Sequence, residues 1–410
     1  MRMELISYKG LGSMYVVYPD GPQICCYENT LITVLREDNS QESVEKILSD
    51  PQLKQLIDQQ RILLLFPNSE NGVWDCRLDL KKQDQAHRIM DMILKFNSRC
   101  EENNFQPYHN MHNARYYVGI GTGASMAQTI AAIYPVNVAG ILTIGGGLAE
   151  DAMKMAVHEP VPAILWNAPE ATQKFFKKIN CVDTEVKEYS YNSVNDMQFV
   201  RCETRSDAIL DGALLLYGWE NLFTKVCRMN SSFYGQLFPR TVRDNYKFIV
   251  HENDPILGMD KPHTWFEYIP EAVKANPTTK VPLLMFLHGG ADSPANIANS
   301  IKLHELAEEE NFILVHPAAT DGVFWNQDMD PRLNDDCGFL EKLLDYMLER
   351  YPIDTTRVYV GGFSNGSSMS QVFAMTHPDR VAAVFANNSA SYTYTHTHAF
   401  DIAGAKKLEY

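Results

Sequence analysis

Short apolar runs, typical of buried strands, alternate along this chain with longer stretches whose apolar residues recur at helical spacing. In residues 337–350, Leu340, Leu343, Leu344 and Met347 fall on one face of a predicted helix. Strands that alternate with helices predict mainly parallel sheets with helices on both faces. Because 410 residues exceed the usual size of one domain, we expect an α/β protein with more than one domain.

The same order of elements occurs twice. Each copy has an apolar strand, a helical stretch, a second strand, a Trp followed by a polar residue, a long amphipathic helix and a third strand. The matching segments are 31–35 and 283–287, 61–67 and 312–317, Trp74–Asp75 and Trp325–Asn326, 84–100 and 337–350, and 116–118 and 358–360. We interpret this as a duplication.

The duplication predicts two domains in tandem, covering residues 1–240 and 265–410. Prolines interrupt the periodicity between them, so residues 241–264 are expected to be a linker. The stretch Trp265–Pro270 then reads as the first strand of the second domain.

A glycine-rich turn follows the third strand of each copy. In the second copy it is G-x-S-x-G, the pattern of a nucleophile elbow, in which glycines leave room for a strained turn between strand and helix. A shift of 243 residues places Gly119, Gly121 and Gly123 on Gly362, Ser364 and Gly366. The sequence therefore predicts Ser364 as a nucleophile, and a degenerate elbow in the first domain.

An oxyanion loop is predicted directly after the strand that ends at Leu287. His288 is followed there by Gly289 and Gly290, whose backbone N–H groups could approach a developing alkoxide, with the N–H of Asn365 as a further donor. We expect His288 to line the pocket, and Trp325 to line either the pocket or the core.

With these motifs, the second copy resembles the polyhydroxybutyrate-depolymerase and feruloyl-esterase group of α/β-hydrolases, over roughly residues 265–390. The resemblance implies serine ester hydrolysis without a cofactor, through an acyl-enzyme, on esters such as short hydroxyalkanoates or acetylated or feruloylated sugars. Besides the elbow and the oxyanion loop it rests on Trp325–Asn326, Asp335–Leu340, Tyr351–Asp354, Arg357–Val360 and Pro378–Ala383.

In that family the catalytic Asp and His follow the elbow in chain order. After the apolar stretch 381–386 the remaining candidates are His396, His398 and Asp401, with no further strand to position a histidine. We therefore expect the acid and the base to lie beyond the end of this chain, and the second domain to be C-terminally incomplete.

The first copy lacks each part of this machinery. Gly121 replaces the nucleophile, Arg36–Glu37 stands in place of His288–Gly289, and no histidine occurs between His158 and His251. We expect a non-catalytic domain that stabilises the second through an intramolecular contact.

The composition of the chain limits the classes of molecule that it is expected to bind. A net charge of −15 disfavours nucleic acid and anionic membranes, and no apolar run approaches the length of a spanning helix. The eight scattered cysteines and the lack of an apolar leader favour a cytoplasmic protein with reduced thiols, although the pair Cys25–Cys26 leaves its redox state open. No metal site is expected, because His109 and His112 lack a third ligand.

Two other functions stay open at this stage. The chain could be an inactive hydrolase-fold module for binding or scaffolding, because its first copy keeps the fold without the chemistry. It could also be a serine peptidase, because an elbow alone does not distinguish an ester from an amide.

Overall fold

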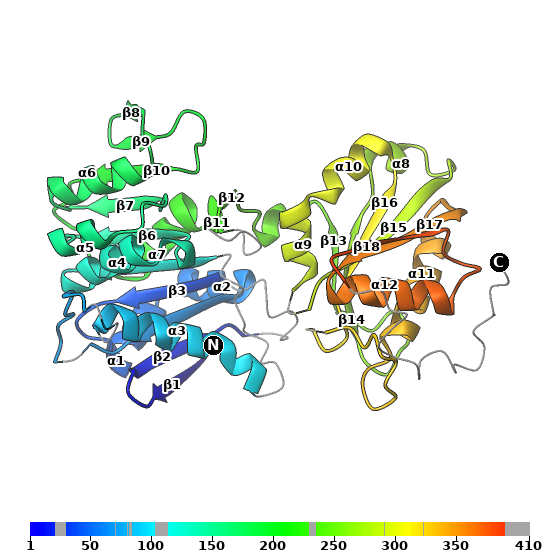
Figure 1. Cartoon of the computed structure of the whole chain (residues 1–410), viewed down its shortest axis with the longest axis horizontal. Coiled ribbons are helices and arrows are strands. Elements are labelled where there is room, and N and C mark those ends of the chain that lie inside the picture. Colours follow the sequence, from blue (N-terminus) through cyan, green and yellow to red (C-terminus); the bar gives the residue numbers. More distant parts are fainter. Residues whose placement is uncertain are drawn as a thin grey trace. The chain divides into compact units, whose positions relative to one another are not determined.

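The computed structural model describes residues 1–20, 30–69, 71–79, 81, 84–102, 114–228, 235–290, 292–322 and 324–389. They form two compact units, the first ending at Asp244 and the second beginning at Asn245. Figure 1 shows that each unit has its own sheet, flanked by its own helices.

The first unit contains a ten-stranded mixed sheet in the order β1-β2-β4-β3-β5-β6-β7-β10-β9-β8. The middle strands, from β4 to β10 in this order, are parallel, and the strands at both ends are antiparallel. The strands are β1 (Arg2–Tyr8), β2 (Gly12–Tyr18), β3 (Thr30–Leu35), β4 (Ile62–Pro67), β5 (Arg115–Ile120), β6 (Gly140–Ile144), β7 (Ala163–Trp166), β8 (Thr184–Val186), β9 (Tyr189–Tyr191) and β10 (Phe199–Glu203).

Helices cover both faces of this sheet because its central strands are apolar on both sides. Leu31 and Leu35 of β3 pack into one core with α3, α4, α5 and α6, whereas Ile32 and Val34 pack into the opposite core with α1, α2 and α7. The helices are α1 (Gln41–Leu48), α2 (Pro51–Gln60), α3 (Gln85–Glu102), α4 (Thr122–Ile133), α5 (Glu150–Met155), α6 (Glu170–Ile179) and α7 (Gly212–Gly218), and the short pair β11 (Val226–Arg228) and β12 (Leu237–Pro239) lies outside the main sheet.

The second unit repeats the beginning of this arrangement. Its sheet has the order β13-β14-β16-β15-β17-β18, which matches β1-β2-β4-β3-β5-β6 strand for strand, including which pairs are parallel. The strands are β13 (Ile249–Asp254), β14 (His263–Tyr268), β15 (Val281–Leu287), β16 (Ile313–Pro317), β17 (Ile353–Phe363) and β18 (Ala383–Asn387).

Helices again lie on both faces. One core packs under α11 (Asp336–Arg350) and α12 (Asn365–Thr376), and the other packs under α9 (Pro294–Ile301) and α10 (Leu303–Glu310). The short α8 (Glu271–Ala275) contributes Val273 to the first of these cores. The predicted α/β class, with helices on both faces of each sheet, is confirmed, and antiparallel strands at the edges make the mainly parallel sheets mixed.

The segment expected to be a linker instead contains a strand. β13 lies within residues 241–264 and pairs antiparallel with β14, so Trp265–Pro270 belongs to the second strand of the unit rather than to the first. The prolines at 255 and 262 mark the turn between these two strands, which is why the sequence pattern suggested a boundary.

The two sheets differ at one edge. In the first unit β6 is buried along its whole length and pairs with β7, whereas its counterpart β18 is the last described strand of its sheet and is exposed along its whole length. Phe385 of β18 is 58% exposed. An apolar strand with an open edge is normally covered in a native fold.

Among the described residues, no helix is long and apolar enough to cross a membrane. Cys76, Cys181, Cys202, Cys227 and Cys337 carry free thiols. The pair Cys25–Cys26 and residues His109, His112, His396, His398 and Asp401 lie outside the described residues.

Candidate active site

Ser364 lies at a sharp turn between β17 and α12. Its backbone has φ 53° and ψ −119°, a conformation that costs a residue with a side chain about 1–3 kcal/mol. The turn is held by a hydrogen bond from the Ser364 N–H to the carbonyl of Asn387 in the neighbouring strand (2.9 Å). This is the strained strand–turn–helix geometry of a nucleophile elbow.

The two flanking glycines are required by close backbone contacts. A Cβ on Gly362 would lie 2.5 Å from backbone atoms of Gly366, and a Cβ on Gly366 would lie 2.2 Å from the carbonyl oxygen of His288. The first turn of α12 therefore lies directly against the loop that follows β15.

That loop carries the predicted oxyanion donors. β15 and β17 are parallel neighbours, and Leu287 pairs with Gly362, so the loop and the elbow leave the same edge of the sheet side by side. A Cβ on Gly290 would lie 3.5 Å from Cβ of Asn365 and 2.3 Å from the Phe324 ring. The loop glycines and the start of α12 thus surround one small space beside Ser364.

His288 and Trp325 support this loop from within the protein. His288 is fully buried: its Nδ1–H donates to the Gly289 carbonyl (2.7 Å), and its Nε2 accepts the Ala319 N–H (3.0 Å). Burial lowers the pKa of His288 to about 4, so the ring is neutral near pH 7. The Trp325 indole, 3% exposed, donates to the His288 carbonyl (2.9 Å). A contact of either ring with substrate stays a prediction.

The side chain of Asn365 also holds a neighbouring loop in place. Its Oδ1 accepts the backbone N–H of Trp325 (2.7 Å), and its Nδ2 donates to Gln327 (3.0 Å). Buried Asp336 at the start of α11 holds the other end of the same loop by accepting the N–H groups of Thr320 (3.0 Å) and Asn326 (2.7 Å). The loop that contains Trp325 is therefore fixed at both ends by hydrogen bonds to residues at helix N-termini.

One carboxyl group close to the oxyanion loop has a raised pKa. Burial raises the pKa of Asp292 to about 6, although its Oδ1 accepts the N–H of Ser293 (2.7 Å) and the amide of Asn296 (2.5 Å). Its own N–H donates to the Gly289 carbonyl (3.2 Å), which fixes the path of the loop.

No histidine is hydrogen-bonded to the Ser364 hydroxyl within the described part of the chain. The described histidines of the second unit other than His288 contact partners elsewhere: His251 contacts Asp254, His263 contacts Phe339, His304 contacts Phe248, His316 contacts Phe286, and His377 contacts Phe373. The predicted nucleophile and the predicted oxyanion donors are thus brought together without a general base among these residues.

The first unit has the same backbone turn without a nucleophile. Gly121 has φ 59° and ψ −124°, and its N–H donates to Ile144 just as that of Ser364 donates to Asn387. The flanking glycines are again required, because a Cβ on Gly119 would lie 2.4 Å from Gly123, and one on Gly123 would lie 2.1 Å from the Leu35 carbonyl.

The loop support is also repeated in the first unit. The Trp74 indole donates to the Arg36 carbonyl (3.1 Å), as Trp325 does to His288. The Trp74 N–H donates to the side chain of Thr122 (3.3 Å), the residue after the elbow, as that of Trp325 does to Asn365. Equivalent hydrogen bonds at equivalent positions support the interpretation that the two units share an ancestor.

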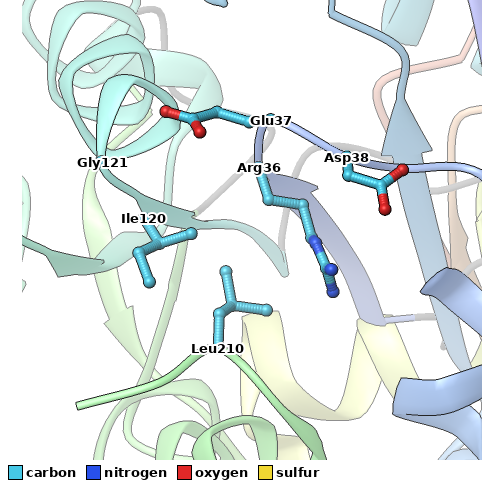
Figure 2. A pocket seen from close by; sticks show the side chains of 6 residues that line it. All are labelled: Arg36, Glu37, Asp38, Ile120, Gly121 and Leu210. Atoms are coloured by element: carbon cyan, nitrogen blue, oxygen red, sulfur yellow. The ribbon is translucent and has the colours of Figure 1, made fainter. Parts of the chain in front are cut away.

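The side chains at the degenerate elbow are entirely different. The Glu37 side chain points toward the elbow (Figure 2), with its Oε1 3.4 Å from the Thr122 hydroxyl. A cavity of about 350 Å³ opens beside it, lined by Arg36, Glu37, Asp38, Ile120, Gly121 and Leu210. Sequence reasoning identified Gly121 but missed this cavity, because Leu210 comes from a distant loop.

Sequence reasoning also missed Phe324, whose ring covers Gly290 and is 41% exposed. The only available signal was its place directly before Trp325. The described residues contain no group of three or more His, Cys, Asp or Glu side chains that could hold a metal ion.

Comparison with known proteins finds similarity to esterases over part of the chain. No protein-family model matches. The bifunctional acetylxylan esterase/xylanase of Neocallimastix patriciarum is 33% identical over 105 residues, which are 26% of this chain and 15% of that protein. Acetylxylan esterase A of Emericella nidulans is 25% identical over 29% of this chain and 40% of its own length, and feruloyl esterase B of Neurospora crassa is 26% identical over 28% and 39%.

The chain thus spans less than half the length of these relatives. Among solved structures, a thermostable esterase matches with a TM-score of 0.29 and 23% identity, over 34% of this chain and 40% of that one. A ferulic acid esterase matches with a TM-score of 0.27 and 20% identity, over 32% and 53%. In sequence, the chain is similar to carboxylic-ester hydrolases.

Proposed function

We propose that the second unit is a serine carboxylic-ester hydrolase with Ser364 as its nucleophile. One observation carries the proposal: Ser364 is held at φ 53° in a turn whose flanking residues, Gly362 and Gly366, lie too close to backbone atoms for a side chain. A strained conformation at a non-glycine residue persists when the surrounding structure imposes it, and such residues cluster at active sites. The similarity to esterases supports the same assignment.

In this mechanism Ser364 Oγ attacks the ester carbonyl while a general base takes its proton. The negative charge on the carbonyl oxygen is stabilised by N–H groups from Gly289 or Gly290 and from Asn365, each worth about 3 kcal/mol in such sites. The alcohol then leaves with a proton, and water hydrolyses the acyl-serine to release the acid and restore the hydroxyl.

We propose further that the acid and the histidine come from strands that extend the second sheet beyond β18. In the first unit β7 and β10 follow β6 in the sheet, whereas β18 is exposed at its edge. Residues that complete this edge would enter at the end of the sheet where Ser364 lies. We expect them to follow residue 410 in the complete protein.

The substrate class follows from the relatives. Acetylated or feruloylated sugars are the esters we favour, because the relatives are acetylxylan and feruloyl esterases. Exposed Phe324 beside the oxyanion loop offers an apolar surface for the acyl group. Short hydroxyalkanoate esters, suggested by the motifs, form the comparison set. In this proposal the first unit is a duplicated hydrolase fold without catalytic activity. A cytoplasmic location of the protein stays a prediction.

A fluorophosphonate probe, which reacts with activated serines, tests the proposal directly. The 410-residue chain and a version extended by its natural downstream sequence are compared, each with a Ser364→Ala control. We expect labelling and hydrolysis of p-nitrophenyl acetate in the extended protein and loss of both in Ser364→Ala. An extended protein without labelling would instead be a binding or scaffolding module, and faster cleavage of aminoacyl anilides than of esters would make it a peptidase.

Turnover by the 410-residue chain serves as an internal check. If it hydrolyses the ester as fast as the extended protein, and Ser364→Ala abolishes this, the base lies within residues 1–410 and the proposed completion of the β18 edge is wrong.

A further inference from the structure

The cavity at the degenerate elbow of the first unit lies where α/β sheets commonly bind ligands. Its lining residues follow the carboxyl ends of the parallel neighbours β3 and β5, and Leu210 comes from the loop after β10. Gly121 has no side chain, and the Glu37 carboxylate points toward it, with Oε1 3.3 Å from where a Cβ on Gly121 would lie (Figure 2). A volume of about 350 Å³ is at the lower end for small-molecule sites.

Arg36 supplies hydrogen-bond donors at this cavity. Its half-buried guanidinium donates to the Ser43 hydroxyl and attracts the carboxylate of Asp38. A guanidinium has five N–H groups in a fixed plane, so several of them remain available for a ligand.

Glu37 and Asp38 supply acceptors. Both side chains are exposed to solvent; Glu37 accepts the Thr122 hydroxyl, and Asp38 accepts the Ser40 N–H (2.9 Å). A carboxylate has about four lone-pair positions, so Glu37 retains free acceptor capacity, whereas Asp38 also accepts hydrogen bonds from the side chains of Ser40 and Ser43 and retains less. Ile120 and Leu210 form an apolar wall opposite these polar groups (Figure 2).

We propose that the first unit binds a neutral, hydroxyl-rich ligand, a saccharide, in this cavity. A hydroxyl group both donates and accepts, so a polyol can satisfy the carboxylates and the guanidinium together. The apolar wall suits the C–H face of a sugar ring. Two carboxylates outnumber the one guanidinium, so the lining repels an anion, and the guanidinium offsets part of its attraction for a cation. This inference goes beyond ester hydrolysis at Ser364 and does not depend on it.

Saturation-transfer NMR on the 410-residue chain provides the test. Xylotriose and cellotriose are the probes, and glycine and inorganic phosphate are the comparison ligands. We expect saturation transfer to at least one trisaccharide and none to glycine or phosphate. Where both trisaccharides bind, we expect each to compete with the other. Binding of glycine alone would point to a zwitterion site and overturn the saccharide assignment. Binding of phosphate alone, or of no probe, would also overturn it.

Two variants locate the binding. Leu210→Trp fills the cavity, and Asp38→Asn removes one charge without changing the side-chain shape. We expect each to weaken trisaccharide binding about tenfold. Leu210→Trp takes up space that the sugar needs, and Asp38→Asn weakens one polar contact with it. Glu150→Gln, an exposed change in α5 outside the cavity, is the matched control and should bind as the unchanged chain does.

Thermal unfolding separates loss of binding from loss of folding. Both variants must keep the melting temperature of the control for their binding to count, and Asp38→Asn is expected to do so because Asp38 is exposed. Unchanged binding in both folded variants would place the saccharide elsewhere and overturn the site. Ester hydrolysis by the extended protein has no bearing on this result, so the two proposals fail independently.

Discussion

Gly121 and Ser364 have almost the same backbone conformation, φ 59° and ψ −124° in one and φ 53° and ψ −119° in the other. Only glycine adopts this conformation without strain. The first unit therefore carries a relaxed form of a turn that the second unit holds under strain.

Replacing the serine by glycine should stabilise the second unit. We expect Ser364→Gly to gain about 1 kcal/mol, because glycine relieves the strain at φ 53°, and to raise the melting temperature by about 2–4 °C. The same variant should show no fluorophosphonate labelling. Ser368→Gly, one turn into α12, is the control and should lose stability. A Ser364→Gly protein that is less stable than the unchanged chain would contradict the conclusion that the backbone at Ser364 is strained.

The reverse change should not create an enzyme. We expect Gly121→Ser to lose about 1–2 kcal/mol, because it introduces the same strain and places a Cβ 3.3 Å from Glu37 Oε1. Combined with Ser364→Ala, it should give no fluorophosphonate labelling at residue 121, since the Glu37 carboxylate lies beside that residue and would repel a developing oxyanion. Labelling there, measured by mass spectrometry, would show that the first unit keeps a working base.

Gly366 should tolerate no side chain. Gly366→Ala would place a Cβ 2.2 Å from the His288 carbonyl oxygen, so α12 and the oxyanion loop must separate. We expect a loss of about 3 kcal/mol in the free energy of unfolding, from urea titration. Ser368→Ala in the same helix is the control, with an expected change of less than about 0.5 kcal/mol. Equal stability of the two variants would argue against the close contact.

Asp292 should make the second unit less stable as the pH rises. Burial raises the pKa of Asp292 from 3.8 to about 6, so its favourable contribution is complete below about pH 4 and is lost as the pH rises through 6. Asp292→Asn keeps the Oδ1 acceptor for Ser293 and Asn296 and removes the charge. We expect it to be about 1–2 kcal/mol more stable than the unchanged chain at pH 7.5, and equally stable at pH 4. A variant that is less stable at pH 7.5 would contradict this.

Buried histidines should act in the opposite direction. Burial lowers the pKa of His263, His288 and His316 from 6.5 to about 4, so their contribution is complete above about pH 6.5 and is lost as the pH falls toward 4. We expect the free energy of opening in the second unit, measured by hydrogen exchange and corrected for intrinsic rates, to fall between pH 7 and pH 5. The expected decrease is up to about 2 kcal/mol for each histidine. His316→Gln should remove about a third of this dependence. An unchanged dependence would show that His316 is already charged at pH 5.

Some of this site could be read from residue order. The strand before each elbow and the helix after it follow from periodicity, and glycines two positions on either side of Ser364 indicate the turn. The linker prediction failed because prolines 255 and 262 mark a turn between β13 and β14 as readily as a domain boundary. Local patterns do not distinguish these cases, since both need only a break in periodicity.

The sequence by itself determined the α/β class, the repeated order of elements and the position of Ser364, because these depend on local spacing of apolar residues and glycines. Only the tertiary structure decided which distant residues meet. It buried His288 beneath the oxyanion loop, laid Phe324 over Gly290, and brought Leu210 to the cavity beside Gly121. Those contacts join segments far apart in the chain, and their energy depends on packing that no local pattern contains.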